Sequence, residues 1–331
     1  MKLKVKHKKY KTFAGPVLYG RTRMNQPDAD DSFLERLVYV TSVVESGGFY
    51  GSIFMADGTG ITGGLCQHVS VLPKSMAWGD FWKLIAYIDS FFPVAYYDLG
   101  ELLDDEGWTF QPDGVLRDVE NNIEVPASLF RNTVTPLDGT VPELADGQSP
   151  VDRNRWLKAK EWCLAAHQIL AQPTTHRPQL IWECRQAQKR IQKTRFHGLL
   201  KGKSVEAAAF PRGLGYHTPF GVPHVEVAML VFLSFAVNAP KWAYTAFDDV
   251  LQVHGHNGFV PCTLGGGYEV LDARGRLFAV ELIKALEQAG GTKWDDDRRY
   301  GRYQRTRDVL LTMYDEDVIA DVMPKDLPEE P

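Results

Sequence analysis

The segment from His224 to Val237 is apolar on every face if it is helical, and this feature constrains the fold more than any other. A helix of this kind needs other elements around it, so we expect it to be the buried central helix of a helical domain. The apolar stretch within it contains Glu226 and is shorter than the roughly 20 residues that a membrane-spanning helix needs. The sequence therefore predicts a helical core rather than a membrane anchor.

Helical periodicity also covers much of the remaining chain. Further helices are expected at about 33–45, 78–92, 153–171, 177–196, 240–252, 275–289 and 303–320. Residues 49–62 instead combine aromatic and β-branched residues with a glycine-rich turn, which favours a small β-hairpin. The predicted fold class is mainly α with a small β element (α+β).

Composition suggests five consecutive parts of the chain. They are a basic N-terminal arm (1–30), a half with the first helix and the hairpin (31–104), an irregular insertion with a few short strands (105–150), a helical half (151–320) and a tail (321–331). The insertion is rich in Asp, Gly, Pro and Asn and lacks a helical pattern. We expect the halves on either side of it to form one domain together.

The charge balance argues against a general nucleic-acid binder. The chain has 37 basic and 42 acidic residues and a net charge of −5, whereas phosphate affinity depends on a surplus of Lys and Arg. The basic residues are nevertheless bunched, with six lysines in the first 11 residues and a second cluster over 185–203. Such a patch could attract a polyanion, although a solvated tail and a solvated helix face are the simpler interpretations.

Cysteine usage and the N-terminus both bear on where the protein folds. The four cysteines have neither metal-type nor CxxC spacing, which is typical of reduced thiols in a protein folded in the cytoplasm. No apolar run follows the basic N-terminus, so we expect no secretory signal peptide and no membrane insertion. A substrate outside the cytoplasm would then require delivery of this protein by another system.

The segment from Glu45 to Gln67 contains the residues best suited to chemistry. Glu45 lies at the expected end of helix 33–45, where the negative end of the helix dipole and apolar neighbours favour the neutral carboxylic acid. A general acid needs that form. Asp57 opens a glycine-rich turn, and Thr62 follows five residues later. The simpler alternatives are a surface Glu, an ordinary Asp-Gly turn and a β-branched residue in a strand.

Two carboxylates on opposite sides of a hairpin are the arrangement that cleavage of a glycosidic bond requires. One carboxyl protonates the leaving oxygen while the other activates water, and inverting enzymes hold the two about 6.5–9.5 Å apart. The hairpin arm between Glu45 and Asp57 would set a separation of this order. The Thr62 hydroxyl could hold the water.

This segment resembles the active-site segment of the lysozyme-like superfamily. Goose-type lysozymes and soluble lytic transglycosylases have a Glu-Ser at a helix end and a glycine-rich hairpin closing in Gly-Leu-Met-Gln; here Glu45-Ser46 leads to Gly-Leu-Cys-Gln at 64–67. Chitosanases of the same superfamily have an Asp-Gly-x-Gly-x-Thr-Gly-Gly string, which residues 57–64 match. The resemblance implies a lysozyme-like helical domain whose hairpin carries part of the active site.

The resemblance also implies roles for individual residues. Glu45 would be the acid, Asp57 the base and Thr62 a residue that positions water, while Tyr50 and Gln67 would bind substrate. A weaker similarity links residues 235–240 to the Tyr-Asn-Ala-Gly segment that lines the sugar groove of transglycosylases. It adds Asn238 to the expected substrate-binding residues.

The expected activity is therefore that of a muramidase-like glycosidase that hydrolyses β-1,4 links of peptidoglycan. It would use no cofactor and no metal, and its partners would be the glycan strand and a phage or delivery machine. A lytic transglycosylase or a chitosanase of the same superfamily, or a catalytically weak lysozyme-like structural or binding module, are the alternatives. His254 and His256 could bind a metal, but they lack an acidic or cysteine partner at useful spacing, which favours a loop.

Overall fold

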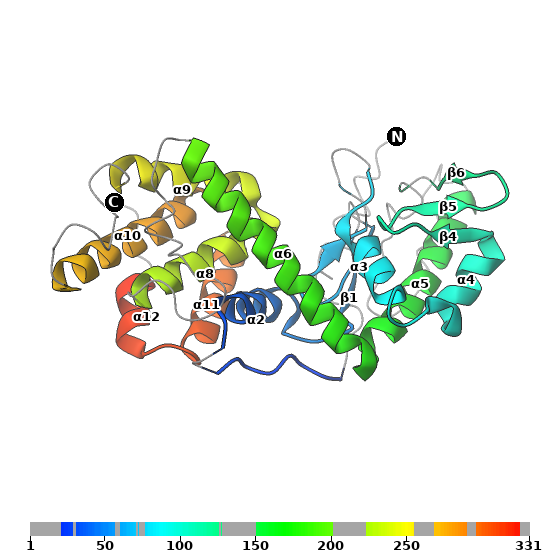
Figure 1. The fold of residues 1–331 in the computed structure, drawn as a ribbon, viewed down its shortest axis with the longest axis horizontal. Helices are drawn as coiled ribbons and strands as arrows, with labels where there is room; N and C mark the ends of the chain where they lie inside the picture. The colour runs from blue at the N-terminus through cyan, green and yellow to red at the C-terminus, as the bar shows by residue number, and fades with distance from the viewer. Residues whose placement is uncertain are drawn as a thin grey trace. The chain divides into compact units, whose positions relative to one another are not determined.

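A computed structural model describes residues 21–28, 31–56, 60–70, 72, 77–125, 127, 150–200, 223–254, 268–289 and 296–324 (Figure 1). Over these residues the protein is mainly helical with small antiparallel sheets, which confirms the predicted mainly α class. The chain divides into two compact units. Unit 1 comprises Met1–Met24 and Glu45–Glu183, and unit 2 comprises Asn25–Val44 and Cys184–Pro331. No helix in the described ranges is both long and apolar enough to cross a bilayer.

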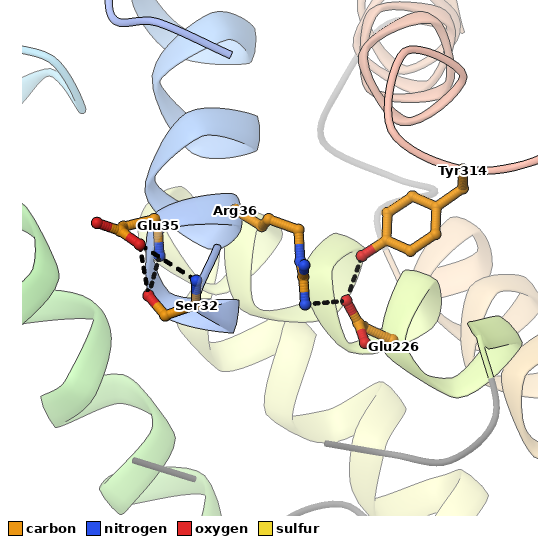
Figure 2. Close-up of polar contacts among 5 residues, drawn as sticks. All are labelled: Ser32, Glu35, Arg36, Glu226 and Tyr314. Carbon is orange, nitrogen blue, oxygen red and sulfur yellow. Dashed lines mark hydrogen bonds and ion pairs between the residues drawn. The ribbon is translucent and has the colours of Figure 1, made fainter. Parts of the chain in front are cut away.

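Helix α2 (Phe33–Ser46) begins and ends at local signals in the sequence. At its start Ser32 and Glu35 form a capping box, in which the Ser32 amide donates to Glu35 Oε2 (3.1 Å) and the Glu35 amide to Ser32 Oγ (3.3 Å; Figure 2). At its end Gly47 and Gly48 have φ of 68° and 76°, a left-handed conformation that glycine adopts without strain. The sequence predicted this termination.

The first sheet of unit 1 follows directly after this helix. Strands β1 (Ile53–Ala56) and β2 (Gly60–Gly63) form the expected antiparallel hairpin, and β2 also pairs with β3 (His68–Val69), a strand that the sequence did not predict. Ile53 and Ile61 are fully buried and join the hydrophobic core of the unit. This packing anchors the sheet to α3 (Asp80–Asp89), which lies against β2 and β3.

The rest of unit 1 surrounds an aromatic core. Its further elements are η2 (Val94–Tyr96), α4 (Asp98–Glu106), a second sheet of β4 (Trp108–Phe110), β5 (Leu116–Asp118) and β6 (Ile123–Glu124), α5 (Pro150–Ala171) and the first part of α6 (Pro173–Leu200). The rings of Phe81, Trp82 and Trp162 are buried together, with Trp82 edge-on to both neighbours at centroid distances of 5.0 and 5.7 Å. Within 105–150, the described residues thus include a small ordered sheet.

Unit 2 is built around the apolar helix that the sequence singled out. Helix α8 (Pro223–Asn238) packs against α9 (Pro240–His254), α10 (Tyr268–Ala289) and α12 (Glu316–Val322), as Figure 1 shows. The helix α11 (Asp296–Leu310) precedes α12. Val227, Leu230 and Phe232 of α8 are fully buried, which confirms the expected central helix.

The C-terminal part of unit 2 differs from the prediction of one helix over 303–320. Two helices, α11 and α12, are separated by a turn at residues 311–315 that contains neither Gly nor Pro. In this turn Tyr314 directs its hydroxyl to Glu226, the acidic residue of the apolar α8 segment (Figure 2). Arg36 Nη2 contacts the same carboxylate oxygen at 2.8 Å, and both charged side chains are buried. The contact from Tyr314 to Glu226 therefore lies at the interruption, and Asp315, the N-cap residue of α12, marks the start of the next helix.

Candidate active site

Glu45 is the penultimate residue of α2 and is half-buried. The residue after it, Ser46, is buried and donates a hydrogen bond from its Oγ to the Leu65 carbonyl oxygen (2.7 Å). Ser52, just before β1, donates from its Oγ to the Ser46 carbonyl oxygen (3.5 Å). These bonds attach the end of the helix that carries Glu45 to the residues just before β1 and just after β2, at the open end of the hairpin.

The Gly-Leu-Cys-Gln motif forms the tight turn between β2 and β3. Gly64 has φ of 84°, and a Cβ at this position would lie 2.7 Å from Leu84 Cδ2 of α3, so a larger residue would strain the backbone and displace the leucine side chain. Gln67 also has positive φ (55°), and its Nε2 donates to the Gly64 carbonyl oxygen (3.1 Å). The glutamine therefore closes its own turn, and the substrate contact expected of it stays a prediction.

Thr62 lies at the centre of the first sheet. It pairs with Phe54 of β1 on one side and with Val69 of β3 on the other, and it is 8% exposed. A threonine in the middle strand of a sheet has a fixed backbone, which suits a residue that positions a small molecule. Asp57, its expected partner, falls outside the described residues.

Tyr50 is held between the N-terminal segment and two helices. Its amide donates to the Thr22 carbonyl oxygen (3.0 Å), and its ring stacks on His176 of α6 with centroids 4.0 Å apart. His167 of α5 contacts the carbonyl oxygen of the next residue, Gly51, through Nδ1 at 2.6 Å. Burial lowers the pKa of His176, which favours the neutral ring against Tyr50.

The expected site residues fall into different units. Glu45, Tyr50, Thr62 and Gln67 all belong to unit 1. Asn238 is the last residue of α8 in unit 2, and it is not among the residues whose side chains the structure describes.

A buried contact between a histidine and a glutamate beside the hairpin was not predicted from the sequence. His68 Nε2 lies 2.8 Å from Glu183 Oε1, and the two side chains are 8% and 0% exposed. The residues are 115 positions apart, so no local spacing could reveal the pair. The only signal was a histidine directly after Gln67. The contact attaches β3 to α6 within unit 1.

The described side chains include no group of three or more His, Cys, Asp or Glu residues placed to hold a metal ion. The arrangement offers a carboxyl group at the end of a helix, beside a three-stranded sheet with a hydroxyl in its central strand. Such a carboxyl group can serve as a proton donor to a ligand bound along the hairpin.

No protein-family model, curated protein or solved structure matches this chain. The resemblance to lysozyme-like enzymes therefore depends on the short segment from Glu45 to Gln67 and on the weaker similarity around Asn238.

Proposed function

We propose that this protein is a muramidase-like glycosidase that hydrolyses β-1,4 links of the peptidoglycan glycan strand by general acid–base catalysis. One observation carries the proposal. Glu45 lies half-buried at the end of α2, next to a serine whose hydroxyl is bonded to the turn between β2 and β3. This reaction class requires a general acid held in a productive position, and a helix end bonded to its neighbours suits that role.

In the proposed reaction Glu45 protonates the bridging oxygen as the bond from the anomeric carbon to that oxygen breaks. Asp57 would accept a proton from a water molecule, and the resulting oxygen nucleophile bonds to the anomeric carbon. Thr62, fixed in the central strand of the sheet, would orient this water. The proton from Glu45 ends on the leaving sugar as a hydroxyl group, and exchange with solvent restores both carboxyl groups.

The bonds around Ser46 support this role because a general acid must lie within hydrogen-bond reach of the leaving oxygen. Loss of about 1 Å in placement can reduce a rate by about 100-fold. The bonds from Ser46 to Leu65 and from Ser52 to Ser46 restrict movement of the helix end relative to the hairpin. They give Glu45 the fixed position that efficient proton transfer needs.

The test is release of soluble muropeptides from purified peptidoglycan by the wild type and by Glu45→Gln. The matched control is Glu161→Gln, which changes an exposed glutamate on α5 of the same unit. We expect Glu45→Gln to lower the rate by about 100-fold or more and the control to match the wild type.

Equal, negligible release by all three proteins would contradict the proposal and favour a lysozyme-like binding or structural module. Mass spectrometry of the products distinguishes the enzymatic alternatives. Reducing ends indicate hydrolysis, whereas anhydro ends indicate a lytic transglycosylase. Release of oligomers from chitosan but not from peptidoglycan would indicate a chitosanase.

A further inference from the structure

In unit 1, a continuous row of aromatic side chains leads from His68, the residue after Gln67, to the surface of the unit. Trp182 of α6 lies edge-on to His68 of β3, with centroids 6.5 Å apart and planes at 84°. Tyr87 of α3 lies 5.5 Å from Trp182 at a tilt of 38°, and Phe91 lies 5.1 Å from Tyr87 at 70°. We call Trp182, Tyr87 and Phe91 the aromatic row.

The two ends of this row lie in different environments. At the inner end, His68 is buried and paired with Glu183, which holds it in place. At the outer end, Phe91 is 54% exposed, and Ile181, which precedes Trp182, is 37% exposed. Tyr87 and Trp182 are half-buried between them. The row therefore presents apolar surface to solvent. Because its side chains already contact one another, they would lose little conformational entropy when a ligand binds.

The chemistry of these rings matches a sugar better than a purely apolar ligand. A pyranose ring presents C–H groups on its faces and hydroxyl groups at its rim. Aromatic rings attract the slightly positive C–H groups through their negative faces, and Trp and Tyr also carry polar groups that tolerate a hydrated ligand. Ligand sites combine such aromatic surfaces with a few polar groups.

The position of the row points to one particular saccharide. Its inner end, Trp182, lies edge-on to His68, which directly follows Gln67 and belongs to the sheet that contains Thr62. A glycan strand is a long polymer, so a strand bound along the hairpin extends beyond the bond that is cleaved. The aromatic row leads from His68 of this sheet to the exposed ring of Phe91.

We propose that the aromatic row is an accessory saccharide-binding surface for N-acetylhexosamine units of the peptidoglycan glycan strand. The choice of ligand rests on the proposed function, but binding at this surface does not require cleavage. The glycan strand would then contact the enzyme both at the aromatic row and at the proposed active site. This second contact would retain the enzyme on its insoluble substrate between cleavage events.

The test is co-sedimentation of the full chain with purified insoluble peptidoglycan, with Glu45→Gln present in every protein so that the ligand stays intact. Phe91→Ala removes the exposed end of the row. Tyr96→Ala is the matched control, because Tyr96 is 85% exposed on the same unit and has no ring contact in the described part of the chain. We expect Phe91→Ala to weaken binding about five-fold, the effect of one aromatic contact, and Tyr96→Ala to leave it unchanged.

Equal binding by the Phe91→Ala and Tyr96→Ala proteins would overturn the inference. Phe91-dependent binding to chitosan oligomers, without binding to peptidoglycan, would also overturn it, because the ligand would be a different glycan. The result of this binding experiment can be distinguished from the result of the muropeptide-release experiment that tests the proposed function. Phe91-dependent binding to peptidoglycan by a protein that releases no muropeptides supports the surface and contradicts the cleavage, and release without Phe91-dependent binding does the reverse.

Discussion

Removal of the Glu226 carboxylate should destabilise unit 2 strongly. Its Oε1 lies 2.8 Å from Arg36 Nη2 and accepts the hydroxyl of Tyr314, and the two charged side chains are only 5% and 8% exposed. Truncating one partner of a buried ion pair typically costs about 3–5 kcal/mol, because the other charge stays buried without that counter-charge. We therefore expect Glu226→Ala to lower the free energy of unfolding by about 4 kcal/mol.

Urea unfolding followed by far-ultraviolet circular dichroism measures this loss. Tyr314→Phe removes the hydroxyl, and with it the hydrogen bond to the carboxylate, and should cost about 1.5–3 kcal/mol. The double variant Arg36→Met/Glu226→Leu removes both charges and fills the space with apolar side chains, so it should recover most of the stability lost in Glu226→Ala. Asp308→Ala, a change at an exposed acid on α11, is the control and should stay within about 0.5 kcal/mol of the wild type.

Two results would refute this reasoning. The first is a loss of less than about 1 kcal/mol in Glu226→Ala, which is the range of ordinary substitutions. The second is a double variant as unstable as the single one, which would show that the charge left behind is not the source of the cost.

Three further predictions concern the alkaline stability of the fold and the geometry of the hairpin. Burial and the neighbouring negative charge of Glu226 raise the pKa of Tyr314 above its ordinary value of 10.0. The folded protein therefore holds this proton more tightly than the unfolded chain, so the stabilisation is complete below pH 10.0 and is lost as the pH rises above that value; the loss, measured by urea unfolding, should be smaller in Tyr314→Phe. Ser46→Ala removes the bond to Leu65 and should cost about 1 kcal/mol in stability and lower muropeptide release, whereas unchanged release would show that this bond does not position Glu45. Gly64→Ala should cost about 1–3 kcal/mol because of its positive φ and its approach to Leu84, and a melting temperature equal to that of the wild type would contradict this.

Much of the fold follows from local signals in the sequence. The Gly47-Gly48 pair marks the end of α2, and both residues have the left-handed conformation that this termination uses. The apolar segment 224–237 predicted a buried central helix because its hydrophobicity has no preferred face, and α8 is buried in unit 2. The aromatic and β-branched residues before the glycine turn at 57–60 predicted the β1–β2 pairing.

The features that the sequence did not predict depend on contacts between distant residues. Strand β3 is only two residues long, too short for a periodic pattern, and the His68–Glu183 pair that attaches it spans 115 positions. The interruption between α11 and α12 contains no helix-breaking residue. It coincides with the bond from Tyr314 to Glu226 and with a bond from Gln26 Nε2 to the Thr312 carbonyl oxygen (2.7 Å). At such places tertiary contacts override the local helix propensity.

The candidate site shows the same division. The position of Glu45 at a helix end and of Thr62 in a strand could be predicted, since both follow from local patterns. The hydrogen bond by which Gln67 closes its turn with the Gly64 carbonyl could not be predicted, because it depends on a positive φ that is unusual outside glycine. The stacking of Tyr50 on His176 joins elements more than 100 residues apart and is likewise invisible in the sequence.

The central claim is that Glu45 donates the proton to the leaving oxygen, and activated substrates test this directly. A dinitrophenyl glycoside of an N-acetylglucosamine oligomer has a leaving group that departs without protonation, whereas a sugar leaving group needs an acid. We predict that Glu45→Gln loses activity on peptidoglycan by about 100-fold or more and keeps activity on the dinitrophenyl glycoside close to that of the wild type. Equal losses on both substrates, or no loss on either, would contradict the assignment of Glu45 as the proton donor.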